Sequence, residues 1–166
     1  QTIILSSIIV IFLVVLIVIY NSLKNTNSLK KISYFDYLTD LYNRWYLEMT
    51  LLNLNDYYDF PVTYIIADIN GLKMVNDAFG YQHGDFLIKE ASRVLLASLP
   101  QNGFVARIGG DEFAVVFSGT NQDAEKYIEK VKSDSAQVNI KGIPLSLAFG
   151  SAQISEDSSN IYDFTR

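Results

Sequence analysis

The pattern of hydrophobic and polar positions divides the chain into an apolar head and a mixed body. Residues 3–20 are apolar except for Ser6, Ser7 and the closing Tyr20. A helix needs roughly 20 such residues to cross the hydrocarbon core of a bilayer, and a tyrosine suits the interface. We therefore expect one transmembrane helix over residues 1–22 and a juxtamembrane linker over residues 23–33.

Two other interpretations of the head stay open. A secretory signal peptide has a shorter apolar core and a small-residue cleavage site, for which residues 19–24 are a poor match. A buried core element agrees with the Ile and Val content, although the length of the run does not favour it. If the head is an anchor, Lys24, Lys30 and Lys31 precede the first acid. The positive-inside rule then predicts a single-pass protein of the inner (cytoplasmic) membrane, with its body in the cytoplasm.

In the body, short apolar runs alternate with stretches of helical periodicity. Strands are expected over residues 62–68, 104–108, 112–117 and 145–154. Helices are expected over residues 71–78, 85–98 and 121–135, with a break at residues 80–84. Residues 34–54 also show helical spacing, interrupted near residues 39–40, in Leu38, Leu41, Trp45 and Leu52. The order β-α-α-β-β-α-β predicts an α/β (α+β) fold with a central sheet backed by helices.

The composition agrees with this division. Residues 1–23 carry no charged side chain, which explains why the mean hydropathy of the 166-residue chain reaches +0.16. The body holds 13 Lys and Arg against 18 Asp and Glu, a formal net charge of −5. This acidic balance argues against a protein that coats nucleic acid, which needs an excess of cations. The absence of Cys from the sequence excludes a disulfide scaffold and a Cys-ligated zinc site.

The candidate chemistry lies around a pair of glycines between two expected strands. Gly109 and Gly110 are a tight hairpin signal, and without a Cβ they let a ligand's phosphates approach the backbone. Asp111 and Glu112 follow, and Asp68 ends the strand over residues 62–68. If these strands are neighbours, the carboxylates converge, as Mg²⁺ requires. Two such metals can activate a hydroxyl and stabilise a leaving phosphate.

A plainer interpretation of the same residues is also open. Residues 109–112 fit a simple hairpin with solvated acids at its turn. Asp68 fits a strand-ending acid that caps the following helix. Motifs elsewhere in the chain bear on this choice.

Three segments together resemble the GGDEF-domain diguanylate cyclases. Residues 109–113, Gly-Gly-Asp-Glu-Phe, are identical to the signature of that family. Residues 36–44, Asp-Tyr-Leu-Thr-Asp-Leu-Tyr-Asn-Arg, resemble its opening D-x-L-T-x-L-x-N-R, and residues 68–80 with Gly84-Asp85 resemble its nucleotide segment. Their order and spacing also match. The resemblance implies a GGDEF domain over residues 34–166, with a mostly antiparallel sheet of the nucleotidyl-cyclase/polymerase-palm-like kind.

The resemblance also implies a reaction. Enzymes of this family join two GTP molecules into cyclic di-GMP and release two pyrophosphates. Each subunit of a head-to-tail homodimer holds one GTP, whose 3′-hydroxyl attacks the α-phosphate of the other. By position, Asp68, the Ile69 carbonyl, Asp111 and Glu112 are expected to ligate Mg²⁺ or Mn²⁺, with two ions per active site. Asp111 and Glu112 are the expected catalytic residues, Asp111 accepting the hydroxyl proton and Glu112 holding the second metal.

Other positions are implied to bind the substrate. Asn76 and Asp85 match the residues that recognise guanine, whose N–H groups a carboxylate can bind in a way that adenine does not allow. The phosphates are expected at a helix N-terminus, a neighbouring lysine and the glycine turn: Gly71, Leu72, Lys73, Gly109 and Gly110. From the residues alone, Asp85 would be an acid favoured by a helix N-terminus, and Asn76 and Lys73 would be solvated helix residues.

Arg107 and His83 fall outside this set. Arg107 fits an exposed strand arginine as well as a nucleotide contact. His83 is expected to be structural or at the surface.

The chain departs from the family pattern at three places. Asn70 stands where many members have a second Asp. Residues 100–103 lack both charged residues of the product-inhibition motif R-x-x-D, so we expect no feedback inhibition through that site. The family continues with a helix whose Lys and Arg side chains hold the phosphates, whereas this chain ends at Arg166. We therefore interpret it as a C-terminally truncated fragment, which alone binds the triphosphate weakly or is inactive.

The leading hypothesis is a membrane-anchored diguanylate cyclase, and two alternatives accompany it. A non-catalytic signalling module would bind GTP or a partner without chemistry. Such relatives usually lose signature acids, and here Asp68, Asp111 and Glu112 are all present. A cyclase that makes another cyclic nucleotide is disfavoured by Asn76 and Asp85, which suit guanine.

Overall fold

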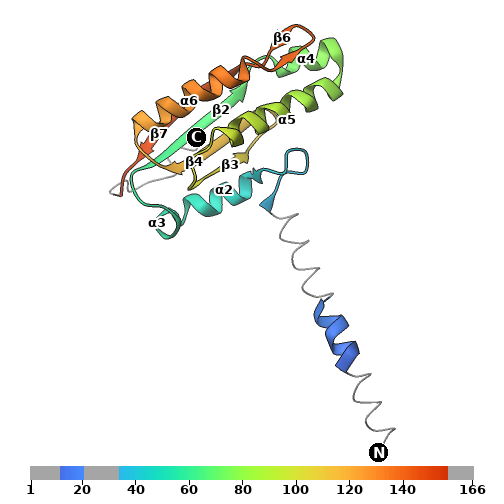
Figure 1. Ribbon diagram of the computed structural model, residues 1–166, viewed down its shortest axis with the longest axis vertical. Helices are drawn as coiled ribbons and strands as arrows, with labels where there is room; N and C mark the ends of the chain where they lie inside the picture. The colour runs from blue at the N-terminus through green and yellow to red at the C-terminus, as the bar shows by residue number, and fades with distance from the viewer. Residues whose placement is uncertain (1–11, 21–33, 157–166) are drawn as a thin grey trace, which may run out of the picture. The chain divides into compact units, whose positions relative to one another are not determined.

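The computed structural model describes residues 12–20 and 34–156 (Figure 1), and the chain divides into two units, Gln1–Tyr34 and Phe35–Arg166. In the first unit, residues 12–20 are helical. The rest of the predicted transmembrane helix and the whole predicted linker lie outside the described residues. Within these two described ranges, no helix has the length and apolar character needed to span a membrane.

The second unit is built on a five-stranded sheet. The strands lie in the order β1 (Tyr42–Asn43), β3 (Gly103–Arg107), β4 (Glu112–Ser118), β2 (Val62–Ile69) and β7 (Leu147–Ile154). Every neighbouring pair is antiparallel except β1 and β3, which are parallel. The prediction of a mostly antiparallel sheet is confirmed.

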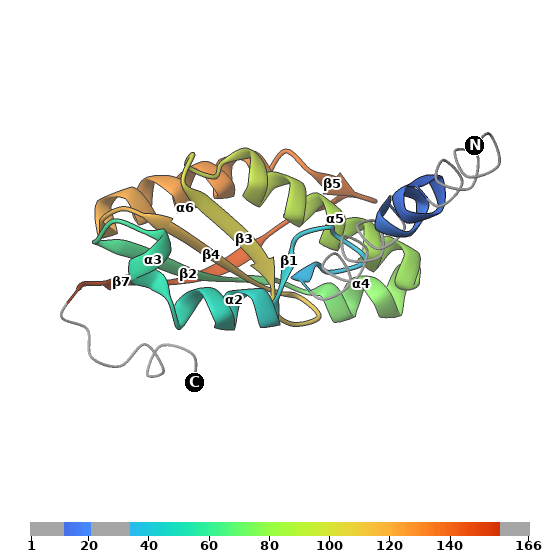
Figure 2. The same ribbon diagram turned by 90° about the horizontal axis from the view of Figure 1, so that it is seen from below.

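Helices cover both faces of this sheet (Figure 2). On one face lie α5 (Tyr81–Ala97) and α6 (Asn121–Ser135), and on the other lie α2 (Arg44–Leu51) and α3 (Leu54–Tyr57). α4 (Leu72–Phe79) follows β2 and lies at the end of the sheet where β3 turns into β4. A short hairpin of β5 (Asn139–Ile140) and β6 (Ile143–Pro144) connects α6 to β7.

Two hydrophobic cores explain why the central strands are so apolar. Along β4, Phe113, Val115 and Phe117 face the core that includes α5 and α6, whereas Ala114 and Val116 face the core that includes α2. A strand covered on both faces carries a continuous apolar run instead of an alternating one. The strands predicted over residues 62–68 and 112–117 are confirmed for this reason, and each continues for one further residue.

Helix α6 has the limits that its periodicity predicts, residues 121–135. Its start is set by a capping box: the Thr120 hydroxyl accepts a hydrogen bond from the Asp123 N–H, and the Asp123 carboxylate accepts one from the Thr120 N–H. Tyr127 and Val131 are buried against the sheet. The Tyr127 hydroxyl donates a hydrogen bond to the Leu95 carbonyl at 2.9 Å, which links α6 to α5.

The predicted break at residues 80–84 is wrong. α5 starts at Tyr81, and Gly80 alone, with φ of 86°, separates it from α4. Gly84 lies inside α5, where a Cβ would overlap the side-chain oxygen of Asn76 on α4. This glycine therefore allows two helices to approach each other and does not end one.

The helical spacing over residues 34–54 corresponds to a helix only in part. Residues 37–39 form a turn, β1 follows, and only then does α2 begin. The buried face of α2 is therefore formed by Leu47 and Leu51. Trp45 and Leu52 are exposed by 47% and 54%. The last strand, predicted from residue 145, starts at Leu147. Residues 143–144 before it belong to the separate strand β6.

Candidate nucleotide and metal site

The antiparallel pairing of β2 and β4 brings the predicted acids to one end of the sheet. Asp68 lies directly opposite Glu112. The Ile69 N–H donates a hydrogen bond to the Asp111 carbonyl at 3.1 Å. Directly opposite residues of an antiparallel pair project to the same face, so the Asp68 and Glu112 side chains stand on one side of the sheet. The neighbouring position of these two strands, on which the sequence argument depended, is confirmed.

The three acids influence one another electrostatically. Burial raises the pKa of Asp68 above its ordinary value, and the nearby carboxylates of Asp111 and Glu112 raise it further. Like charges disfavour the ionised form of a carboxyl, and a cation placed among them favours it. This end of the sheet is therefore a place where a cation would be stabilised.

The donor atoms at this edge fit a hard divalent cation. The carboxylates of Asp68, Asp111 and Glu112 and the carbonyl of Ile69 supply the oxygen ligands that Mg²⁺ and Mn²⁺ prefer. Among the residues that the structure describes, no three acidic or histidine side chains are grouped so as to hold a metal as they stand. The Glu112 carboxylate lies over Gly109, where a Cβ would come within 2.5 Å of its Oε2.

The glycine turn is held by its backbone and by one side chain. The N–H groups of Ile108 and Gly109 both donate to the Glu112 carbonyl, at 2.9 and 3.3 Å. The Arg107 guanidinium donates to the Gly110 carbonyl at 2.7 Å. A Cβ built at Gly110 would meet no described atom within 4 Å. The turn is thus fixed in shape and open on the side of Gly110, which suits the approach of a ligand.

Arg107 also pairs with Asp36 of the opening motif. Its Nη1 lies 3.1 and 3.3 Å from the two carboxylate oxygens, and the two side chains are only 12% and 16% exposed. Asp36 accepts further hydrogen bonds from the N–H and hydroxyl of Thr39, at 3.0 and 2.7 Å. Arg107 is therefore not an exposed strand arginine: it is a tether between the opening turn and the glycine turn.

The tether also sets the protonation of Asp36. Burial by itself would raise the pKa of this carboxyl. The hydrogen bonds from Thr39 and the charge and hydrogen bonds of Arg107 act in the opposite direction, and together they lower the pKa below its ordinary value. Ionised Asp36 is thus part of the folded state.

The predicted phosphate-binding residues open helix α4 beside this edge. Gly71 caps the helix with φ of 75°, a value that favours glycine, and supplies no side-chain cap. Leu72 is buried and Lys73 is exposed. The cap residue Gly71 therefore offers no side-chain acceptor to the backbone N–H groups of the first turn. A helix start that binds an anion needs such N–H groups to point at the ligand.

The predicted guanine-binding residues lie on two packed helices. Asn76 is on α4 and the exposed Asp85 is on α5. The Asn76 side-chain oxygen is buried against Gly84 and has no hydrogen-bond partner among the described residues. A buried oxygen of this kind needs a donor, which a ligand or an ordered water can supply.

Asn70, the departure from the family pattern, has a structural contact. Its N–H donates to the Ser146 carbonyl at 3.0 Å, and its side-chain amide donates to the Ser146 hydroxyl at 2.9 Å. An amide thus joins the end of β2 to the segment before β7, where many family members have an acid.

Comparison with known proteins identifies the family. The family model described as "Diguanylate cyclase, GGDEF domain" matches residues 33–165, which is most of the chain. The chain belongs to the GGDEF-domain family.

Individual relatives agree with this assignment. The chain is 34% identical over 119 residues to the signaling protein YkoW of Bacillus subtilis, and 30% identical over 135 residues to the diguanylate cyclase DgcS of Shewanella oneidensis. These alignments cover 66% and 78% of this chain but only 15% and 46% of the relatives, so the chain spans less than half their length.

A solved structure supports the fold. The coiled coil and GGDEF domain of DgcB from Caulobacter crescentus, in complex with c-di-GMP, superposes with a TM-score of 0.74. The sequence identity is 20%, and the match covers 82% of this chain and 78% of that chain. The α+β architecture with a mixed sheet backed by helices is therefore that of solved GGDEF domains.

The tether is the part of the site that sequence reasoning missed. The sequence identifies Asp36 only as part of the opening motif, and it leaves two interpretations of Arg107 open. The two residues are 71 positions apart, so that only their opposite charges suggest a pair and no local pattern joins them.

We expect Asp36→Asn to lower the free energy of unfolding by about 1–3 kcal/mol at neutral pH, because a partly buried arginine loses its charged partner. The folded-state pKa of Asp36 is lowered, so its contribution is present above the unfolded pKa and is lost as the pH falls through the folded value. Urea unfolding at several pH values measures this difference, which should shrink below about pH 4. The exposed Asp59→Asn is the matched control. A difference that does not change with pH would contradict the account.

Proposed function

We propose that this protein is a diguanylate cyclase, which condenses two GTP molecules into cyclic di-GMP and releases two pyrophosphates. The observation that carries the proposal is the position of Asp68 opposite Glu112, with Asp111 beside Ile69, at the end of the sheet where α4 begins. Membership of the GGDEF family and the diguanylate cyclase named among its relatives support it.

In this proposal the acids of the sheet edge hold the metal. Asp68, the Ile69 carbonyl, Asp111 and Glu112 would ligate Mg²⁺ or Mn²⁺, two ions per site. When bound, the metal lowers the pKa of the attacking 3′-hydroxyl and neutralises charge on the phosphates. Asp111 would accept the hydroxyl proton, and Glu112, whose carboxylate lies over Gly109 in this structure, would turn toward the metal. The raised pKa of Asp68 supports a cation at this place.

The nucleotide would lie along α4. Its phosphates meet the first-turn N–H groups at Gly71 and Leu72, the charge of Lys73 and the open glycine turn. Its guanine edge meets Asp85, which accepts from the N–H groups, and Asn76, whose buried oxygen lacks a partner among the described residues. Recognition by these two residues favours guanine over adenine.

The reaction requires two copies of the domain. Cyclic di-GMP consists of two identical halves, and one sheet edge of this chain presents one nucleotide site. A homodimer with two-fold symmetry places two such sites face to face, which matches the symmetry of the product. The Asp36–Arg107 tether would keep the glycine turn rigid where the two bound nucleotides face each other.

The apolar head would anchor the enzyme. We propose that residues 3–20 cross the inner membrane once and that the GGDEF domain faces the cytoplasm, on the basis of the apolar run and the lysines at positions 24, 30 and 31.

The full chain should then sediment with membranes and resist extraction at high pH. A variant without residues 1–23 should move to the soluble fraction, because it loses the apolar surface that partitions into lipid. Glu129→Gln, a change on the exposed face of α6, is the control that should not alter partition. Extraction of the full chain by alkaline buffer would overturn the anchor.

The enzymatic proposal is tested by incubating the full-length protein with GTP and Mg²⁺ and measuring cyclic di-GMP. We expect Asp111→Asn to reduce the rate roughly 10²–10⁴-fold, because it removes the proton acceptor. Glu129→Gln is the matched carboxylate-to-amide control and should retain activity. GTP binding without product from the wild type would favour the non-catalytic alternative, and equal rates for both variants would refute the role of Asp111.

A further inference from the structure

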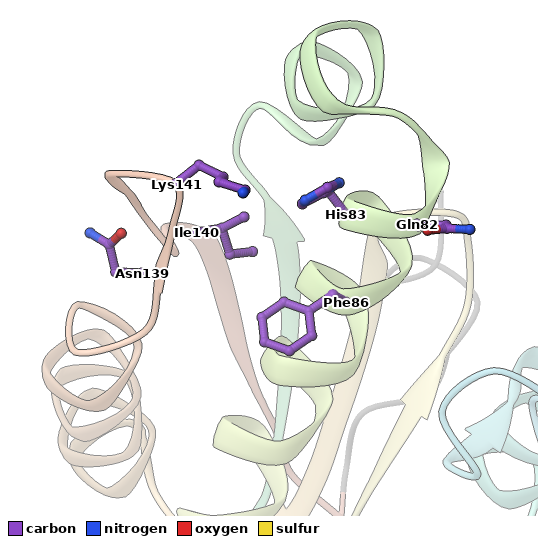
Figure 3. Close-up of a pocket in the computed structure, with 6 residues that line it drawn as sticks. All are labelled: Gln82, His83, Phe86, Asn139, Ile140 and Lys141. Carbon is purple, nitrogen blue, oxygen red and sulfur yellow. The ribbon is translucent and has the colours of Figure 1, made fainter.

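A groove lies between α5 and the β5–β6 hairpin, away from the acids described above. It has a volume of about 410 Å³ and is lined by three residues of α5 and three of the hairpin: Gln82, His83, Phe86, Asn139, Ile140 and Lys141 (Figure 3). The groove is shallow and widely open to solvent, so a ligand would lie on it with one side exposed. The lining combines a cation, an imidazole, an aromatic ring and two amides.

The position of Lys141 is unusual for a lysine. It forms a two-residue turn with Gly142, and both residues have positive φ, 53° and 90°. Such turns favour Asn, Asp or Gly, so a lysine here costs conformational free energy. The Asn139 side chain accepts a hydrogen bond from the Gly142 N–H at 2.8 Å and holds the turn. The Lys141 side chain extends over the groove toward His83 (Figure 3).

His83 presents a hydrogen-bond acceptor to the same groove. Its Nδ1 lies 2.8 Å from the Phe79 carbonyl, which can only accept, so Nδ1 carries the proton. The Nε2 of the neutral ring is then an acceptor that suits a ligand's O–H or N–H group. Phe86, one turn along α5, is 49% exposed and offers the face of its ring.

This groove is distinct from the predicted guanine site. Neither Asp85 nor Asn76 is among the residues that line the groove, although Gln82 lies one turn before Asp85 on α5.

We propose that the groove binds a nucleoside monophosphate. Lys141 pairs with the phosphate, His83 accepts a hydrogen bond from the sugar or base, and the base lies against Phe86. The ligand class follows from the combination of one ammonium, one acceptor and one aromatic wall in a groove of this volume.

The test uses 5′-AMP as the probe, because adenine does not suit the predicted guanine site. In ¹⁵N-labelled full chain in detergent, 5′-AMP should shift the amide signals of Gln82, His83 and Lys141 in a saturable way. Lys141→Asn removes the cation while suiting the turn, and should weaken binding roughly tenfold or more. Phe86→Ala should also weaken it. Lys89→Gln, which removes an exposed lysine of α5 outside the groove, should not.

Three results would overturn the proposal. The first is the absence of saturable shifts at the groove. The second is equal weakening by Lys141→Asn and Lys89→Gln, which would show a general charge effect. The third is inorganic phosphate binding as tightly as 5′-AMP, which would show an anion contact without recognition of the nucleoside. Weaker binding of both inorganic phosphate and adenosine would support it.

Discussion

Strands β2 and β4 pair antiparallel from Val62 and Ser118 to Asp68 and Glu112, and this register controls both the core and the site. Each strand is covered by helices on both faces, so its alternate side chains enter two different cores. A slip of one residue would exchange the faces of every side chain, placing Phe113 where alanine fits and moving Asp68 away from Glu112. The packing that stabilises the fold therefore also keeps the acids together.

The Asp36–Arg107 tether adds a second constraint on the same edge. Strand pairing positions Glu112, whereas the glycine turn before it has no side chains of its own to hold it. Arg107 holds this turn in place, because its guanidinium donates hydrogen bonds to the Gly110 carbonyl at one end and to Asp36 at the other. The opening turn of the domain is thereby connected to the turn at the proposed phosphate site.

Local patterns predicted the local structure well. The periodicity of residues 121–135 predicts the limits of α6, and the apolar runs predict β2 and β4, which are buried on both faces. Predictions failed where contacts between helices determine the structure. A glycine at position 84 suggests a helix break, but Gly84 lies inside α5 and leaves room for Asn76 of α4. The converging acids could be predicted once adjacent strands were assumed. The tether could not, because no local rule joins side chains 71 residues apart.

The central claim is that the ends of β2 and β4 jointly hold the divalent cations of the proposed site. Paramagnetic broadening by Mn²⁺ in the ¹⁵N-labelled full chain tests it most directly. The account predicts that substoichiometric Mn²⁺ broadens the amide signals of residues 67–70 and 109–113 together, and that Asp68→Asn abolishes both effects. Broadening of one segment without the other, or broadening confined to the acids of α6, would contradict it.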